Sequence, residues 1–328
     1  MAVADTTSVI NYSGALYAKS NNNTRLLDAI LTRGRTENVA RTGVRKVDSI
    51  EFPLYSSYEI PDGSQPAITE TASLTATVGA VVTRSQEKNN IQIFQEAVEV
   101  SYLKQSSVGT LGGVNIARQN NNVGNETDFQ IQAKLLKMKK DLNYTYINGV
   151  GQTSSSNTTA WKSKGVIAGI TDNAVEYSTS FDKNIINVAI ATAMENGFTF
   201  DDGRTELWVN PSDLSTISDV YGYGESTFIQ PASRTTGGIA IREIITDFGI
   251  IRVDYDTMIP AGTYLVLNMG QLAIAEMDVT DIDGFNKGTW FYEELAKKGA
   301  SNAAQIYGQA GIDYGAQIKH IKITRASS

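Results

Sequence analysis

The sequence predicts a mixed α+β fold. Three observations support this prediction: one long helical repeat, a pair of alternating strand patterns before it, and a second half in which short helical and strand patterns follow one another. Asn, Ser, Thr and Gly are abundant, whereas only 6 of the 328 residues are proline. This composition favours a chain with many turns and few rigid linkers.

The first 46 residues are basic, although the chain as a whole is acidic. They carry seven Lys and Arg against three Asp and Glu, whereas the net charge of the chain is −7. Apolar residues at 26, 27, 30 and 31 share one face of a short helix that we expect over residues 24–33, between Asn23 as cap and Gly34 as terminator. This segment is either a solvated surface or an arm that docks on acidic neighbours.

Two alternating patterns, over residues 47–58 and 80–102, predict long strands that face each other. The residues between them, 59–79, are rich in Pro, Thr, Ser and Ala and have too little periodic apolar content to pack a core. Loops of this length usually bind something or carry a function. We therefore predict a long protruding β-hairpin that acts as a contact arm.

Residues 125–149 form the strongest helical pattern in the chain. Ile131, Leu135, Met138, Leu142 and Tyr146 recur at helical spacing and make one apolar stripe. Asn125 is a favourable N-cap, and Gly149 is placed to end the helix. At about 1.5 Å per residue, such a helix spans roughly 35 Å.

Helices and strands mix in the second half. A helix is expected from Asp182 to Gly197, and a strand at residues 207–209 leads to Pro211 at the start of another helix. Strand patterns follow at residues 239–246, 250–254, 264–268 and 272–276, with Gly249 turning a hairpin, and a strand-rich stretch at 291–324 closes the chain.

The composition argues against an enzyme. With no cysteine and one histidine, His320, the chain has no disulfide, no thiolate metal site and no zinc site that needs two of its own imidazoles. Residues 247–249 match the metal-binding triplet of kinases, but the other kinase motifs are missing, and the acids at 278, 281 and 283 lack calcium-loop spacing. We expect no catalytic residue, cofactor or metal, and we expect His320 to be a partly exposed strand residue.

The sequence also carries no sign of a membrane protein. No run of about eighteen uncharged apolar residues occurs, and residues 1–12 lack the blocks of a secretory signal. We therefore expect the chain to have no membrane partner and to stay in the compartment where it is made.

The order of the elements, from basic segment and long hairpin to long helix, mixed α/β region and closing strands, resembles the HK97-type capsid fold. Within that fold, several stretches resemble the SU10-like branch of phage major capsid proteins. These stretches are residues 88–94, 98–101, 141–149, 246–260 and 295–312. The resemblance extends over roughly residues 45–325.

The resemblance implies four parts. They are an N-terminal arm (1–46), an extended β-hairpin loop (47–102), a peripheral domain with the spine helix 125–149 (103–160 and 286–315), and an α/β axial domain (161–285 and 316–328).

The implied function is that of a major capsid protein, which self-assembles into hexamers and pentamers of an icosahedral phage shell. The shell would enclose double-stranded DNA without sequence-specific binding, and it would be assembled in the host cytoplasm as part of the virion. Beyond other copies of itself, the implied partners are a portal and a separate scaffolding protein, because the hairpin begins too early in the chain to leave room for an internal scaffolding segment.

The resemblance also implies where subunits meet, with the hairpin lying over the next subunit and the N-terminal arm beneath it. The candidate intersubunit contacts are Arg33, Arg35, Arg41, Arg45, Pro61, Asp62, Pro66 and Glu70. HK97 itself crosslinks its subunits through a loop lysine, but residues 59–79 contain no lysine. We therefore expect no such crosslink.

Three alternatives stay open at this point. An encapsulin-like nanocompartment shell would share the fold and enclose enzymes instead of DNA. A β-rich tail or adhesin protein would also be polar and free of cysteine, although it should show repeats or a trimerising coiled coil, and the sequence has neither. An enzyme would have the mass of a monomer or a small oligomer.

Overall fold

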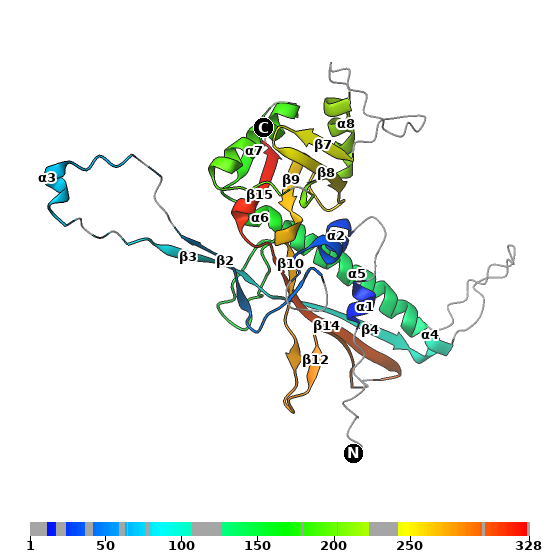
Figure 1. Cartoon of the computed structure of the whole chain (residues 1–328). Coiled ribbons are helices and arrows are strands. Elements are labelled where there is room, and N and C mark those ends of the chain that lie inside the picture. The colour runs from blue at the N-terminus through cyan, green and yellow to red at the C-terminus, as the bar shows by residue number, and fades with distance from the viewer. Residues whose placement is uncertain are drawn as a thin grey trace.

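The computed structural model describes residues 12–17, 24–36, 42–58, 63, 65–76, 79, 81–106, 126–178, 180–201, 203–222, 242–296 and 299–326. Its two main parts are built around two sheets and are joined at a narrow waist, with a long hairpin projecting to one side (Figure 1). Among these residues, no helix is long and apolar enough to cross a membrane.

The first sheet is organised around one long strand, β14 (Ser301–Asp313). On one side β14 pairs with β4 from Ser301↔Ser101 to Ala310↔Gln92, and on its other side it pairs first with β13 and then with β10. β1 adds to β10 in parallel. The remaining strands of this five-stranded sheet are β1 (Val44–Lys46), β4 (Gln92–Ser101), β10 (Ala273–Glu276) and β13 (Trp290–Glu294).

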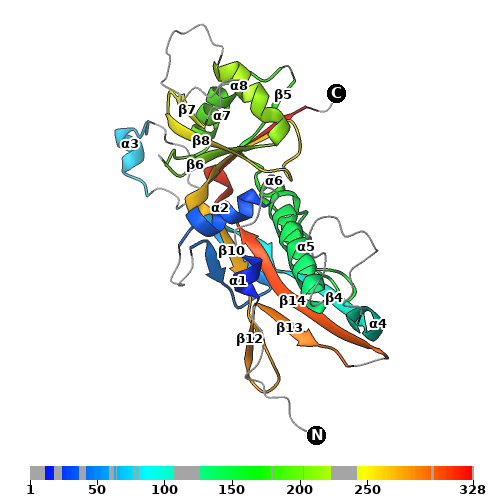
Figure 2. The same ribbon diagram turned by 90° about the vertical axis from the view of Figure 1, so that its right-hand side faces the viewer.

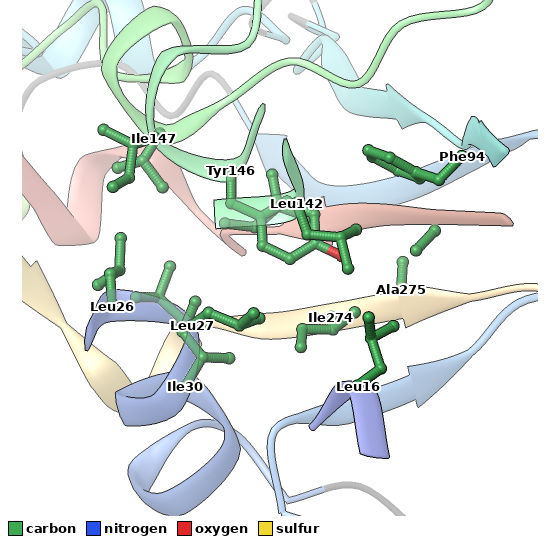
Figure 3. Packing of buried hydrophobic residues seen from close by; sticks show 14 of the residues in the cluster. Leu16, Leu26, Leu27, Ile30, Phe94, Leu142, Tyr146, Ile147, Ile274 and Ala275 are labelled. Carbon is green, nitrogen blue, oxygen red and sulfur yellow. The ribbon is translucent and has the colours of Figure 1, made fainter. Parts of the chain in front are cut away.

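Helix α5 (Glu126–Asn148) packs along this sheet, together with α1 (Ser13–Leu16), α2 (Arg25–Arg33) and the short α4 (Tyr102–Ser106). The side chains of Ile131, Leu135, Met138, Leu142 and Tyr146 are all buried, as the apolar stripe predicts. Figure 3 shows residues of α1 and α2 facing Leu142, Tyr146 and Ile147 of α5, beside Ile274 and Ala275 of β10. We call this sheet and α5 the five-stranded half.

The second sheet has six strands in the order β5-β15-β9-β6-β8-β7. α7 (Lys183–Glu195) and α8 (Leu214–Gly222) pack with one face of this sheet around a second apolar cluster. The opposite face contributes Trp208, Leu265 and Leu267 to the first cluster, which therefore extends through the waist. We call this sheet with α7 and α8 the six-stranded half; its strands are β5 (Ala174–Tyr177), β6 (Thr205–Val209), β7 (Glu243–Thr246), β8 (Gly249–Tyr255), β9 (Thr263–Asn268) and β15 (His320–Arg325).

Short elements complete the chain. α6 (Val166–Gly169) lies at the waist and packs against α5 (Figure 2), and 3-10 turns occur at Pro211–Asp213, Met269–Gln271 and Gln317–Lys319. Two hairpins project from the molecule. One is formed by β2 (Glu51–Tyr58) and β3 (Arg84–Asn90) with α3 (Glu70–Ser73) in its loop, and the other by β11 (Val279–Thr280) and β12 (Asn286–Gly288).

Several predicted elements are confirmed. The long helix covers Glu126–Asn148 against the predicted 125–149, and α2 ends at Gly34. Gly249 follows the turn between β7 and β8. The predicted caps Asn23 and Asn125 lie outside the described residues.

Other predictions need correction. Residues 80–102 do not form one strand of the hairpin: β3 pairs with β2, but β4 pairs with β14 in the five-stranded sheet. β10, which the sequence assigned to the axial part, also belongs to that sheet. His320 is fully buried instead of partly exposed: it pairs with the buried Leu267 of β9, and its ring lies 2.7 Å from the carbonyl oxygen of Tyr314.

The N-terminal segment is also more than an arm. Leu26, Leu27 and Ile30 of α2 are fully buried in the first cluster, and β1 is part of the five-stranded sheet. The described residues between 12 and 46 are therefore packed into the fold of their own chain, which neither a solvated surface nor a docking arm would require.

Candidate intersubunit surfaces

The β2–β3 hairpin is held rigidly at its base. The side-chain amide of Asn89 donates to the carbonyl oxygens of Ile312 (2.7 Å) and Lys164 (2.9 Å), and its oxygen accepts from the backbone N–H of Lys164 (2.7 Å). Two residues earlier in β3, the carboxylate of Glu87 accepts a hydrogen bond from the side-chain amide of Gln317 (2.6 Å). The hairpin therefore leaves the body from a fixed point.

The outer part of this hairpin exposes apolar side chains. Every described side chain from 65 to 76 is exposed, and Leu74 and Val81 keep 84% and 93% of their surface in solvent. An isolated two-stranded hairpin is only marginally stable in water. The candidate contacts Pro66 and Glu70 lie in this exposed part, whereas Pro61 and Asp62 lie outside the described residues.

The second hairpin, β11–β12, exposes an apolar side chain at its tip. Ile282 is 100% exposed at its tip. At its base Lys46 donates to Asp278 (2.5 Å), which also accepts from Thr289 (2.6 Å). Burial opposes ionisation of Asp278, but the hydrogen bonds from Lys46, Thr289 and Asn286 outweigh it and lower the pKa of this carboxyl.

Two predicted contact residues, Arg33 and Arg35, bind acids of their own chain. Arg33 binds acids of the six-stranded sheet, and Arg35 binds an acid of the five-stranded sheet. Arg33 reaches Glu206 of β6 (2.8 Å) and Asp254 of β8 (3.6 Å). Burial raises the pKa of Glu206, and the charge and hydrogen bonds of Arg33 act in the opposite direction. Arg35 donates to the fully buried Asp313 of β14 (2.5 Å).

Arg45 completes this pattern. It donates to Asp313 (2.6 Å) and to the carbonyl oxygen of Pro53 (2.8 Å). Arg33, Arg35 and Arg45 are thus bound by acids of their own chain, while Arg41 lies outside the described residues. The basic segment does dock on acidic groups, but the groups that the structure gives it are its own; a contact of these arginines with a neighbour stays a prediction.

The sequence analysis missed the acidic side of these pairs. Glu206 stands in the strand sequence Thr-Glu-Leu-Trp-Val, all of it buried, and a buried acid between apolar strand residues requires a partner. That signal was available, but the sequence does not identify which basic residue supplies the partner. Among the described residues, no group of three His, Asp or Glu could hold a metal ion.

Comparison with known proteins decides between the alternatives for this shell-like fold. The sequence profile of the SU10 major capsid protein family matches residues 2–327, which is nearly the whole chain. The chain belongs to this family. It is the major capsid protein of a tailed phage head and part of the virion capsid, and it is a structural protein instead of an enzyme.

Solved structures agree on the HK97-type fold of this capsid protein. The capsid asymmetric unit of cyanophage A-1(L) is 10% identical, with a TM-score of 0.62 and coverage of 94% of both chains. Microbacterium phage Oxtober96 gives 10% identity, a TM-score of 0.54 and coverage of 99% of this chain and 96% of the other. The structure from Mycobacterium phage Patience is 11% identical, with a TM-score of 0.53 and coverage of 87% of this chain and 83% of the other.

An encapsulin also shares the fold. The holo-SrpI encapsulin complex from Synechococcus elongatus is 9% identical, with a TM-score of 0.50 and coverage of 99% of this chain and 96% of the encapsulin chain. The fold therefore does not separate an encapsulin from a phage capsid protein, whereas the family match does. No curated protein sequence matches this capsid protein.

Proposed function

We propose that this capsid protein forms hexamers and pentamers that close an icosahedral shell around double-stranded DNA, and that the β2–β3 hairpin lies over the neighbouring subunit. The observation that carries the proposal is the hairpin itself. Its base is fixed by Asn89, but its outer part exposes Ile68, Leu74, Val81 and Val82. A second copy of the chain would cover these side chains, and many such small contacts add up to a stable lattice.

The five-stranded half corresponds to the peripheral domain and the six-stranded half to the axial domain in this proposal. We assign β4 and β10 to the peripheral domain, because both pair with β14. The hairpin arm is then limited to the stretch from β2 to β3.

The remaining partners follow from charge and packing. The acidic chain, with a net charge of −7, disfavours tight binding of phosphates. In this proposal packaged DNA is enclosed without sequence-specific contacts. A separate scaffolding protein would guide assembly in this proposal, and the described N-terminal residues would stay packed in the body of the subunit. A portal would close one vertex, and assembly would take place in the host cytoplasm.

The test replaces residues 62–77 with a short Gly/Ser turn. Because the described side chains of this stretch, at 63 and 65–76, are exposed, the free energy of unfolding of the subunit should change by no more than about 1 kcal/mol. Shells should nevertheless fail to form, as measured by sedimentation and electron microscopy beside thermal melting.

Point variants sharpen this test. Leu74→Ser with Val81→Ser should weaken assembly, whereas Thr71→Ser with Thr75→Ser, in the same exposed loop, should leave it unchanged. Normal shells from the loop replacement, or unfolding of the subunit, would show that the hairpin is not the intersubunit arm.

A further inference from the structure

Helix α2 lies at the waist, between the six-stranded half and the five-stranded half (Figures 1 and 2). It is nine residues long, with Arg25 at its first position and Arg33 at its last. Its apolar face is fully buried at Leu26, Leu27 and Ile30. The helix therefore contacts both halves. Some of its polar contacts are made with the six-stranded half and the others with the five-stranded half.

Both terminal arginines bind the six-stranded half. Arg25 binds Asp254 of β8 through Nε (3.1 Å) and Nη2 (2.6 Å), with its guanidinium 4.0 Å from the ring centre of Tyr255. Arg33 binds Glu206 of the adjacent strand β6 at 2.8 Å. The two ends of α2 are thus fastened to neighbouring strands of one sheet.

The middle of α2 binds the five-stranded half. Lys139 of α5 is almost fully buried and lies 2.7 Å from Asp28 of α2. The backbone N–H of Leu27 donates to the side-chain oxygen of Asn143, also on α5 (3.1 Å).

A buried carboxylate joins the three elements. Asp256, which follows β8, accepts from the N–H of Leu26 (2.9 Å) and from the side-chain amide of Asn143 (2.9 Å). All of Asp256 and Asn143 is buried. A change in the angle between the halves would stretch these hydrogen bonds and leave the buried carboxylate with the N–H of Met258 from its own loop, and the loss of buried donors costs more than the loss of a surface contact.

We propose that α2 is a clasp that fixes the orientation of the six-stranded half relative to the five-stranded half, through the pairs that Arg25 and Arg33 make within their own chain. The orientation of the halves sets the angle at which subunits join, so the clasp also sets the curvature of the shell. This last step rests on the proposed closed shell, whereas the clasp itself does not.

The first experiment measures the orientation directly. Because the chain has no cysteine, Ile93→Cys on β4 and Val188→Cys on α7 give two unique labelling sites, which are 54% and 57% exposed. Spin labels at both sites, in chains diluted with unlabelled protein, report the distance between the halves. The parent should give one narrow distance peak, and Arg25→Gln with Arg33→Gln should lose it.

The matched control stays within one half. Lys134 and Lys137 of α5 both bind Glu96 of β4, so Lys134→Gln with Lys137→Gln removes two charges without touching the waist. This variant should keep the narrow peak, and so should Arg25→Lys with Arg33→Lys, which retains both charges. An unchanged peak in the Arg→Gln variant would overturn the clasp.

The second experiment tests whether the pairs act within a chain or between chains. Arg25→Glu alone and Asp254→Lys alone should each give shells of mixed diameter in electron microscopy. Both changes in one chain should restore a uniform diameter, but co-expression of the two single variants should not.

The outcomes separate the two hypotheses. Restoration by co-expression would place the pair between subunits and overturn the clasp, as would uniform shells from every variant or failure of the same-chain double variant. If the parent chain closes no shell while the distance peaks behave as expected, the proposed function fails and the clasp stands.

Discussion

At the scale of single residues, His320 is the clearest case of a side chain fixed by its surroundings. Its ring is fully buried, with Nε2 2.7 Å from the carbonyl oxygen of Tyr314 and Nδ1 3.3 Å from the backbone nitrogen of Asn268. A carbonyl requires a donor and an N–H requires an acceptor, so these contacts assign the neutral tautomer with its proton on Nε2. Burial lowers the pKa of His320 to about 4.

This lowered pKa predicts acid sensitivity. The folded chain binds the proton less readily than the unfolded chain, so the stability from His320 is complete above pH about 6.5 and is lost as the pH falls towards about 4. At about 1.36 kcal/mol per pKa unit, the loss is on the order of 3 kcal/mol. The measurement is denaturant unfolding of the subunit between pH 4 and 7.5.

His320→Gln is the control for this prediction, because it keeps one donor and one acceptor but does not titrate. Carboxylates contribute their own pH dependence to both proteins, so the comparison is between the two slopes. Equal slopes below pH 6.5 would mean that His320 is not the titrating group.

Gly308 predicts a steric effect of one methyl group. A Cβ at this position of β14 would lie 1.9 Å from the ring of Trp290, which is fully buried and pairs with Gly308 across the strands. Gly308→Ala should lower the free energy of unfolding by about 1–3 kcal/mol, the usual cost of overpacking. Gly299→Ala, which meets nothing within 4 Å, should change it by less than about 0.5 kcal/mol. Equal melting temperatures would contradict the tight packing of Trp290.

At the scale of elements, the sequence predicts local structure better than it predicts partners. The apolar stripe of α5 is confirmed because periodicity reports which face is buried. Alternation also identifies β4 as a strand, but its partner β14 lies about two hundred residues further along the chain and not in the hairpin. Burial of His320 was missed for a related reason, since alternation predicts exposure on the face opposite to Ile321 and Ile323, whereas His320 on that face contacts Tyr314 and Asn268, which are distant in the sequence.

The N-terminal segment shows the same limit. Its charge and its short helix are visible in the sequence, whereas the acids that bind Arg33, Arg35 and Arg45 come from strands far along the chain. The positive charge of the N-terminal segment therefore predicted that it binds acidic groups. It did not predict that these groups belong to the same chain.

If the N-terminal segment is part of the fold, removal of its arginines should destabilise the subunit. If it were a free arm, the stability of the subunit should not change. Among the residues that the structure describes, Arg35→Gln with Arg45→Gln leaves the buried Asp313 with one backbone donor, the N–H of Gly315. Breaking such a pair should lower the free energy of unfolding by about 3–5 kcal/mol, measured by denaturant unfolding of the subunit. Arg325→Gln, at the exposed end of β15, is the control and should change it by less than about 0.5 kcal/mol. An unchanged stability of the double variant would support the arm interpretation.

At the scale of the whole molecule, the order of the elements was sufficient to predict the HK97-type fold, and the family match confirms it. The chain crosses the waist several times, and the sequence does not mark where it passes from one half to the other. β10, which follows β9 after a short 3-10 turn, is the example: adjacent strands in the sequence belong to different sheets.

The assembled particle gives a prediction about covalent chemistry. Residues 59–79 contain no lysine, so the hairpin loop lacks the amine for an intersubunit isopeptide bond. Purified particles boiled in denaturant should run as a single band at the chain mass of 35.5 kDa. Unheated particles that enter the gel only as large species serve as the control for assembly, and a ladder of multimers after boiling would show a crosslink of another kind.

The central place of β14 also bears on synthesis of the chain. This strand joins β4, β13 and β10, and β10 in turn holds β1, so the sheet is incomplete until residue 313 has left the ribosome. Pairings over such long sequence separations form late and slowly. A prematurely terminated chain that lacks β14 cannot complete this sheet, and the five-stranded half of the subunit cannot form. Unfinished translation products are thereby kept out of the growing shell by the connectivity of one strand.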